Sequence, residues 1–301
     1  MAGSKIIKKR IASVRNTRKI TRTMEMVSTA KSKKLVDRVN AAQPYTRKLH
    51  DIMATLVEAG AAHIDSPLMR RKENPERIAL LVITANRGLC GGYNSNVLKL
   101  ARVQLEILRS EGRKADVYAV GKKATSYFKF IDIPVEKAFL DIDDNFTYEQ
   151  AEDLANFFMN EFVRDRYDRV DIISTVYHSA GRQTPEVNRL LPIGLKEMTG
   201  EADQHEGKLK AEVKTIQGPV IYDPSPEQIM LNMIPLAVKT SMYGALLEAA
   251  ASEQIYRRVA MKNATDAAGE MLKNLTREYN RARQASITQE LSEIVAGADA
   301  V

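Results

Sequence analysis

The chain has 301 residues, of which 44% are hydrophobic and 28% are charged, so it carries enough apolar sequence for one or two globular cores. Its formal net charge of +7 indicates either an acidic partner or surface, or a long basic helix face in contact with solvent. Cys90 is the only cysteine, which excludes an intramolecular disulfide and fits a reducing compartment. The longest aliphatic run, 78–83, is far shorter than the roughly 20 residues of a membrane-spanning helix, so no transmembrane segment is expected.

Residues 1–60 are predicted to form one long helix. Ser4 is the expected N-cap, Pro44 is expected to kink the helix, and Gly60 to end it. Apolar residues recur at intervals of three and four, with a shift of phase that is typical of a coiled coil with local over- or underwinding. The stripe comprises Ile7, Ile11 and Val14, then Ile20, Met24 and Val27, and then Leu35, Val39, Ala42, Leu49, Met53 and Leu56.

The charge of this first helix is one-sided. Up to Lys34 there are eleven basic residues and one acidic residue, Glu25. A nucleic-acid-binding arm is one interpretation of such a segment. No aromatic residue lies between the basic ones, however, and the apolar stripe runs through them, which favours a coiled-coil helix with a basic outer face. No nucleic-acid partner is therefore expected.

The period of the apolar pattern changes in residues 75–195. Short aliphatic runs alternate with helical patterns there, which predicts a Rossmann-like α/β domain with a mostly parallel sheet. Residues 196–224 are polar and predict an irregular loop. The predicted strands are 77–84, 115–120, 170–177 and an edge strand at 186–193, and the predicted helices are 95–110, 122–130 and one that runs from a capping box at Thr147 and Gln150 to about Arg166.

Residues 225–301 are predicted to form a second long helix. Ser225 is the expected N-cap with Gln228 completing a capping box, Pro226 occupies the first turn, and Pro235 is expected to bend the helix. Some 75 helical residues would span roughly 110 Å, so the helix needs a partner along its length. The simplest fold is an antiparallel coiled coil of the two terminal helices, with the α/β domain inserted between them. The stripe comprises Leu246, Ala249, Ile255, Val259, Met271, Leu275, Tyr279, Ala282, Ile287, Leu291 and Ile294.

A glycine-rich loop, 88–92, is the best candidate for binding a nucleotide, because such a loop before a helix can hold a phosphate. Its glycine spacing fits neither the dinucleotide fingerprint nor the P-loop, and no acidic residue lies at the expected distance. The pattern favours a tight turn, with nucleotide binding as the alternative. Cys90 is expected to be a packing residue of that turn, since no histidine lies near it in sequence.

Nothing else in the chain has the spacing of a catalytic or metal site. The four histidines are scattered, the acidic residues 141–144 predict a solvated turn, and methionines on the helical stripes predict core packing. No catalytic, cofactor-binding or metal-binding residue is therefore expected. The histidines are His50, His63, His178 and His205, the acidic residues are Asp141, Asp143 and Asp144, and the methionines are Met24, Met26 and Met261.

Four stretches along the chain carry a family resemblance: 11–34, 87–94, 258–271 and 287–300. The last reads ITQELSEIVAGADA, a signature of threonine and two acidic residues followed by Gly-Ala. With these motifs the chain resembles the gamma-subunit family of F-type ATP synthases, whose members form the central rotor stalk. The signature residues are Thr288, Glu290, Glu293, Gly297 and Ala298.

The resemblance implies a non-catalytic subunit of a proton-translocating ATP synthase. Its coiled coil would stand inside the hexamer of alpha and beta subunits, and its α/β domain and foot would bind the epsilon subunit and the membrane c-ring. Torque from proton flow would then drive ATP synthesis. The match begins almost at Met1, so we expect a bacterial protein without a transit peptide, peripheral to the cytoplasmic face of the inner membrane. Cys90 is alone, so thiol control of the chloroplast type is not expected.

The resemblance also implies contact residues. Arg257, Gln284 and Thr288 match positions that grip a loop of the beta subunit, and Met24 is expected near them, at a position where added bulk or charge disturbs coupling. The tip 285–301 has no Lys or Arg and is expected to act as an apolar bearing. Competing hypotheses are an α/β nucleotide-binding protein with coiled-coil arms and a basic protein that binds nucleic acid or membrane. The other expected partner contacts are Ile287, Glu290, Leu291, Glu293 and Ile294.

Overall fold

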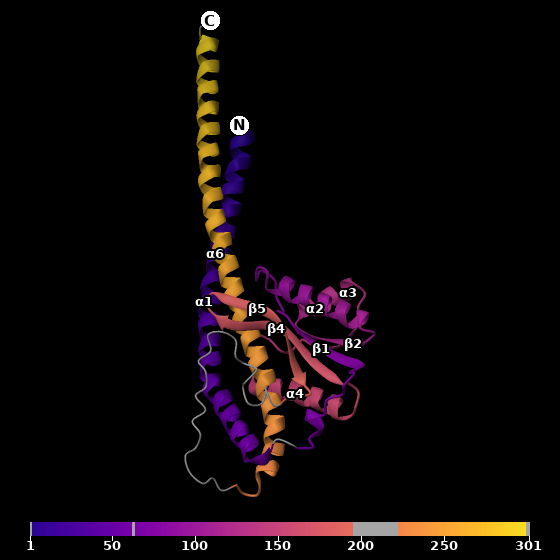
Figure 1. Cartoon of the computed structure of the whole chain (residues 1–301). Helices are drawn as coiled ribbons and strands as arrows, with labels where there is room; N and C mark the ends of the chain where they lie inside the picture. The colour runs from indigo at the N-terminus through magenta and orange to yellow at the C-terminus, as the bar shows by residue number, and fades with distance from the viewer. Residues whose placement is uncertain (1, 62–63, 195–221, 299–301) are drawn as a thin grey trace. The chain divides into compact units, whose positions relative to one another are not determined.

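The computed structural model describes residues 2–61, 64–194 and 222–298. The chain divides into two compact units, of which the first combines Met1–Ala30 with Arg257–Val301 and the second is Lys31–Tyr256. Two long helices, α1 (Ala2–Leu56) and α6 (Pro226–Ala298), contribute to both units (Figure 1). Both long helices that the sequence predicts are therefore present.

The second unit contains a five-stranded sheet in the order β3-β2-β1-β4-β5. The first four strands are parallel to one another, and β5 pairs antiparallel with β4 at the edge. This confirms the predicted Rossmann-like, mostly parallel sheet. The strands are β1 (Arg77–Ile83), β2 (Lys114–Val120), β3 (Val135–Phe139), β4 (Arg169–Ser179) and β5 (Arg182–Leu191).

Helices cover both faces of this sheet (Figure 1). Ile78 and Leu80 point to one face and pack with α2 and α3, whereas Leu81 and Ile83 point to the other and pack with α4 and with the α1 and α6 segments of this unit. Because both faces are buried, β1 reads as an uninterrupted aliphatic run rather than as an alternating one. The shorter helices are α2 (Tyr93–Ser110), α3 (Lys122–Phe130) and α4 (Tyr148–Val163).

Local capping signals predict the starts of α4 and α6 correctly but not the start of α1. The amide of Gln150 donates to Thr147 Oγ1 at 3.4 Å, and the amide of Thr147 donates to Gln150 Oε1 at 3.0 Å, so the predicted capping box is confirmed. Ser225 Oγ accepts from the amide of Gln228 at 3.3 Å, which confirms the N-cap of α6. The predicted N-cap at Ser4 is wrong, because α1 already begins at Ala2.

The sequence does not predict β3. This strand is short, lies at the sheet edge and carries exposed Glu136 and Lys137 at its centre, so its apolar signal is weak. The edge strand β5 begins at Arg182, four residues before the predicted start at residue 186. Most of the polar segment 196–224 lies outside the described residues.

Gly60 ends the first helical segment as predicted. A five-residue π-helical turn, Val57–Ala61, follows α1, and within it Gly60 has a φ of 102°, a left-handed value that glycine adopts without strain. Pro44 and Pro235 lie inside α1 and α6, and the kinks expected at them stay predictions.

The first half of α6 is a core helix of the second unit. Met230, Ile234, Val238 and Met242 lie four residues apart and are each 0% exposed. By length and composition alone α6 is apolar enough to cross a membrane, which the sequence analysis did not anticipate; 33% of its most apolar window is buried in the described structure. A soluble core helix passes the same test, and the buried stripe accounts for this apolar character by packing.

The backbone at Gly121 leaves no room for a side chain, which predicts a loss of stability on substitution. It joins β2 to α3 with a φ of +90°, and a Cβ there would lie 2.2 Å from the carbonyl oxygen of Thr84. We expect Gly121→Ala to destabilise the chain by at least about 2 kcal/mol, because both the conformation and the contact oppose a side chain. Chemical unfolding followed by circular dichroism measures this loss.

The matched control is Gly181→Ala in the turn between β4 and β5. No atom lies within 4 Å of a Cβ built at Gly181, so we expect a change within about 0.5 kcal/mol. Equal unfolding free energies for the two variants would contradict the argument from backbone geometry.

Candidate functional site

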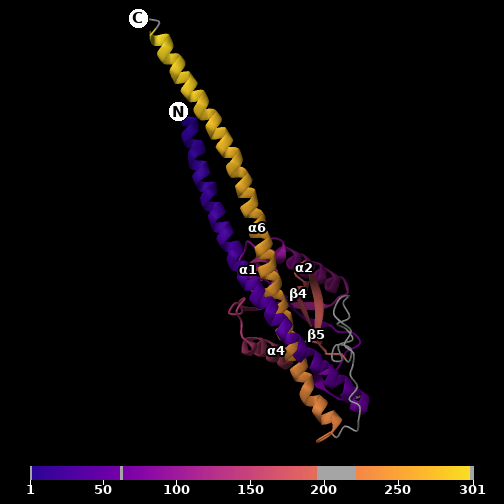
Figure 2. The same cartoon turned by 90° about the vertical axis from the view of Figure 1, so that its left-hand side faces the viewer.

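The first unit is an antiparallel pair of helices formed by the start of α1 and the end of α6 (Figure 2). Thr21 Oγ1 and Thr265 Oγ1 lie 2.9 Å apart, one on each helix. A Cβ added to Gly269 would lie 3.6 Å from Arg18 Nε, so these two residues also face each other. The two contacts set one antiparallel register, which confirms the predicted pairing of the chain's terminal helices.

The seam between the two helices is made of small and polar side chains. Thr21 is 9% exposed and Ser28 is 2% exposed, whereas Ile20 and Val27 are 61% and 50% exposed. The predicted phase shift is therefore wrong for Ile20 and Val27, whereas Met24 is half-buried and stays on the stripe. The seam keeps its spacing of three and four residues through Thr21 and Ser28, and the large apolar residues beside them face outward.

The same correction applies to α6. Val259 and Met271 are 48% and 53% exposed although the predicted stripe includes them. The buried positions are Met261, Thr265 and Ala268, at 4%, 5% and 8% exposure. The core packing predicted for Met261 is confirmed, whereas Thr265 and Ala268 were missed because small side chains also fill a seam where the helices lie close together.

A groove with a volume of about 590 Å³ lies beside this seam. Its lining carries charges of both signs, so it favours neither an anion nor a cation, and no nucleophile lies beside a general base in it. The groove is lined by Arg18, Asp266, Gly269, Glu270, Leu272, Lys273, Thr276 and Arg277.

The predicted contact residues fall into two groups along this coil. In the register set by Thr21, the half-buried Met24 lies about five residues, or roughly 8 Å, from the level of Arg257, which is 7% exposed. Gln284 and Thr288 are exposed and lie more than about 20 residues farther along α6, or over roughly 30 Å. The structure thus brings Met24 near Arg257 and not near Gln284 or Thr288.

The end of α6 extends past the start of α1 (Figures 1 and 2). Ile287, Leu291 and Ile294 follow a spacing of four and three residues and are 48%, 58% and 67% exposed. Such a stripe on an unpaired helical segment is typical of a surface that another chain covers. The side chain of Glu293 lies outside the described residues.

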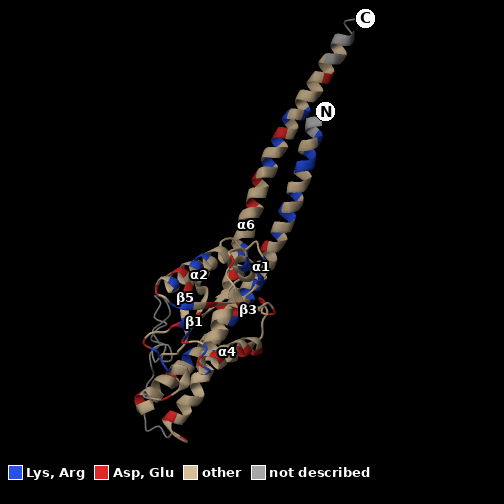
Figure 3. Ribbon diagram, turned by 90° about the vertical axis from the view of Figure 1, so that its right-hand side faces the viewer, with Lys and Arg blue, Asp and Glu red and all other residues tan. Residues whose placement is uncertain are grey.

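Polar contacts on this tip are local to the helix. Thr288 Oγ1 donates to the carbonyl oxygen of Gln284 at 3.0 Å, and Ser286 Oγ donates to Glu290 Oε1 at 3.4 Å. Lys and Arg side chains follow the start of α1 (Figure 3), whereas residues 285–301 contain none. The tip therefore offers apolar groups and carboxylates to a partner, and the helix beside it offers cations.

The glycine-rich loop folds as a tight turn. Leu89 and Gly91 have positive φ values of 62° and 54°. The amides of Lys122 and Ala124, at the start of α3, donate to Asn86 Oδ1 and Thr84 Oγ1 at 3.0 and 2.9 Å. The loop leads into α2, where the amide of Tyr93 donates to the carbonyl oxygen of Cys90 at 3.2 Å, so the loop closes a hydrogen-bonded turn at this helix start.

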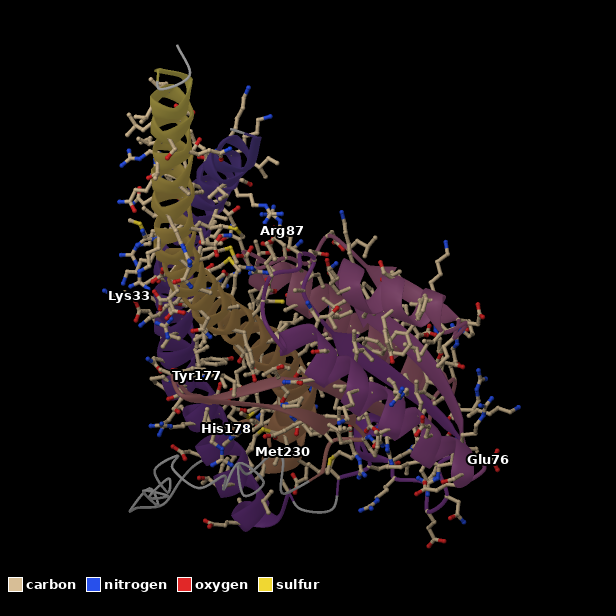
Figure 4. All side chains as sticks on the ribbon, turned by 90° about the horizontal axis from the view of Figure 1, so that it is seen from above. Lys33, Glu76, Arg87, Tyr177, His178 and Met230 are labelled. Carbon is tan, nitrogen blue, oxygen red and sulfur yellow. The ribbon has the colours of Figure 1, made fainter. Side chains whose placement is uncertain are left out.

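Cys90 is a packing residue of this turn, as predicted. Its side chain is 2% exposed, and Asn94 Nδ2 lies 3.0 Å from its sulfur. Arg87 belongs to the same loop (Figure 4). The structure thus assigns the loop a structural role in joining β1 to α2.

Of the four histidines, the structure describes His50 in α1 and His178 in β4. His178 on β4 (Figure 4) hydrogen-bonds through Nε2 to Thr184 Oγ1 and Glu186 Oε1 of β5, at 2.6 and 3.0 Å. His63 and His205 lie outside the described residues. Within 2–61, 64–194 and 222–298, no group of three His, Cys, Asp or Glu residues is arranged to hold a metal ion.

One acidic residue has a role that the sequence analysis missed. Asp144 was predicted to lie in a solvated turn, but its Oδ2 accepts hydrogen bonds from Lys31 Nζ at 2.6 Å and from Gln254 Nε2 at 2.9 Å. That prediction is wrong because partners from two distant helices, 113 and 110 residues away in sequence, meet at this carboxylate. Charge patterning within the loop contains no signal for such a contact.

Comparison of the sequence with known proteins identifies the family. The family model described as ATP synthase matches residues 3–301. The ATP synthase gamma chain of Leptospira biflexa is 49% identical over 302 residues and covers 100% of both chains. The chain belongs to the ATP synthase gamma chain family. The gamma chain of Moorella thermoacetica, 42% identical over 301 residues with 100% of both chains covered, agrees.

Solved structures show the same fold. The rotor of the Euglena gracilis mitochondrial ATP synthase contains a chain with a TM-score of 0.63 and 19% identity, over 95% of this chain and 99% of that one. A second structure from this organism, of its OSCP/F1/c-ring assembly, has a TM-score of 0.65 and 21% identity, over 99% of this chain and 94% of that one. Long terminal helices with a mixed α/β sheet are thus the fold of this gamma chain family.

The buried threonine pair generates a prediction about the coil of the gamma chain. Each hydroxyl also lies near a carbonyl oxygen of its own helix, Thr265 near Met261 at 2.8 Å and Thr21 near Arg18 at 3.1 Å. Thr21→Val removes the bond between the helices together with the bond from Thr21 Oγ1 to the carbonyl oxygen of Arg18, and we expect a loss of about 1 kcal/mol. Unfolding free energies of both single variants and of Thr21→Val/Thr265→Val measure the coupling between them.

We expect the loss in the double variant to be smaller than the sum of the two single losses, because both single variants lose the same bond between the helices. Thr23→Val is the control, since Thr23 is exposed and bonds only to the carbonyl oxygen of Lys19, at 3.0 Å. Fully additive losses at Thr21 and Thr265 would rule out a bond that fixes the register.

Proposed function

We propose that this chain is the rotating central stalk of a bacterial F-type ATP synthase and carries no catalytic site of its own. The observation that carries the proposal is the antiparallel coil with its exposed apolar tip, in a chain that matches gamma chains over its full length. The tight turn of the glycine-rich loop, with Leu89 and Gly91 at positive φ and the Tyr93 amide bonded to the carbonyl oxygen of Cys90, argues against the alternative, a nucleotide-binding protein with coiled-coil arms.

The proposed partners follow from the distribution of charge and apolar surface. The coil and its tip stand inside a hexamer of alpha and beta subunits, where few ionic contacts need to break as the tip turns. The second unit, including the end of α1 and the start of α6, binds the epsilon subunit and the c-ring. The chain is then held at the cytoplasmic face of the inner membrane only through the complex.

Coupling in this proposal is differential binding. One asymmetric coil faces three beta subunits, so each orientation of the coil stabilises a different conformation in each of them. A given orientation of the coil shifts the conformational equilibrium of a beta subunit only if the coil binds one of its conformations more strongly than another. The size of the shift is set by the difference between these two interaction free energies. Proton flow through the ring supplies the free energy that moves the coil from one orientation to the next.

The proposed contacts use both groups of residues along the coil. Arg257 and Met24 lie roughly 8 Å apart along the coil and form one contact zone with a beta subunit, where a buried guanidinium matches an acidic side chain. Gln284 and Thr288 form a second zone near the tip, together with its apolar stripe. The two zones lie over roughly 30 Å apart along the shaft, so they touch different levels of the hexamer.

Co-purification tests the function. A tagged chain expressed in its host is expected to bring down two larger subunits with ATPase activity, together with ring and epsilon subunits when the membrane is solubilised mildly. Recovery of the chain alone, at physiological ionic strength, would refute the stalk assignment. Recovery with nucleic acid in place of these subunits would instead support the basic-arm hypothesis.

Met24→Lys tests the first contact zone. We expect this variant to assemble and hydrolyse ATP but to pump at least about twofold fewer protons per ATP, because a charge beside Arg257 changes the differential contact with beta. The ratio of gradient formation to phosphate release in inverted vesicles measures this loss. Met26→Lys, at a side chain that is 63% exposed, is the control and is expected to keep the normal ratio. A normal ratio in Met24→Lys would remove this residue from the contact zone.

A further inference from the structure

The loop 140–147, between β3 and α4, contacts both long helices within the second unit. We propose that this loop is a clamp that fixes α1 and α6 to the α/β domain, with Asp144 as its central positioning residue. The proposal rests on the stalk function, because a clamp matters where the helices and the domain must turn together. It adds a place where torque passes between the domain and the shaft.

The first layer of the clamp is ionic. Asp144 Oδ2 accepts from Lys31 Nζ of α1 at 2.6 Å and from Gln254 Nε2 of α6 at 2.9 Å. The side chain of Asp144 is 18% exposed and Gln254 is 3% exposed, so the bond between them is shielded from water, whereas the side chain of Lys31 is 46% exposed. One carboxylate oxygen thus holds both helices, and charge-assisted bonds of this kind are stronger than neutral ones.

The second layer is aromatic. Arg38 Nη2 of α1 donates to the carbonyl oxygen of Phe146 at 3.2 Å and to Tyr243 Oη of α6 at 3.1 Å. The guanidinium carbon also lies 5.4 Å from the centroid of the Phe146 ring, and that ring packs edge-on against Tyr243 with centroids 5.7 Å apart. Phe146 is 2% exposed, so the loop again meets both helices at a buried point.

The spacing of the two layers matches the helices. Lys31 and Arg38 are about two turns apart on one face of α1, and Tyr243 and Gln254 are about three turns apart on one face of α6. Because the helices are antiparallel, the residue nearer the start of α1 shares a layer with the residue nearer the end of α6. The two layers therefore contact each helix at two points on the same face. A rotation of either helix would break its contacts in both layers.

The loop itself is held to the α/β domain. Asn86 Nδ2 donates to the carbonyl oxygen of Ile142 at 3.1 Å, and Gln150 Nε2 donates to that of Asp141 at 3.3 Å. Within the loop, the amide of Asn145 donates to Asp143 Oδ1 at 2.8 Å. These bonds fix the loop between the β1 turn and α4, so a force on Asp144 is passed to the sheet rather than taken up by the loop.

The assembled ATP synthase in inverted vesicles provides the test, with Asp144→Ala as the first variant. We expect ATP hydrolysis within about twofold of the unmodified complex, a proton yield per ATP lowered at least about twofold, and amide exchange in 140–147 raised about tenfold. The exchanged variant Lys31→Asp/Asp144→Lys restores the ion pair, with the Gln254 amide turned to offer its oxygen, and is expected to restore the yield. Asp141→Ala removes an exposed carboxylate of the same loop and is the matched control.

Two results would overturn the clamp. One is a normal proton yield in Asp144→Ala despite raised amide exchange in the loop. The other is an exchanged variant that stays as impaired as Asp144→Ala, including the case in which neither assembles. Failure of the stalk function is distinguishable, because the unmodified chain itself would then neither join an ATPase nor support pumping.

Discussion

The structure depends on the close antiparallel contact between the ends of the chain. In the first unit this contact is made through small buried side chains, with Thr21 and Thr265 bonded across it at 2.9 Å. Small residues let the two helices approach closely, and a directional bond at the seam selects one register where apolar packing alone is weakly selective. The register in turn decides which residues of α1 and α6 share a level, so it places Met24 within roughly 8 Å of the level of Arg257 and leaves the tip of α6 beyond α1.

The same two helices serve a different purpose in the second unit. There α6 buries a stripe of large side chains, among them Met230 and Ile234, and with α1 and α4 it covers one face of the sheet. The helices are therefore core elements in one unit and an exposed shaft in the other. This change of role explains why α6 is strongly apolar near its start yet carries outward-facing residues such as Val259 farther along.

Features set by neighbouring residues were predictable from the sequence, and features set by distant ones were not. The capping box at Thr147 and the aliphatic run of β1 are local, and both were predicted within a residue. The seam was misplaced, because Thr21 and Ser28 give no apolar signal and their burial depends on the opposite helix. Asp144 was missed for the same reason, since its partners Lys31 and Gln254 lie over a hundred residues away. The family resemblance identified the expected contact residues. Their positions along the coil came only from the structure.

The magnitudes explain why the joint between domain and shaft needs several contacts. One charge that crosses 100 mV releases about 2.3 kcal/mol, and several such steps are summed before one ATP is released. A single hydrogen bond contributes only about 1 kcal/mol, so a joint that relied on one bond would open before the shaft turned. The two layers at Asp144 and Phe146 are loaded together and rest on a packed core that resists shear. The bonded seam prevents α1 and α6 from sliding past each other, and the clamp divides the force on the domain between several contacts. Torque on the domain is therefore transmitted to the tip of α6.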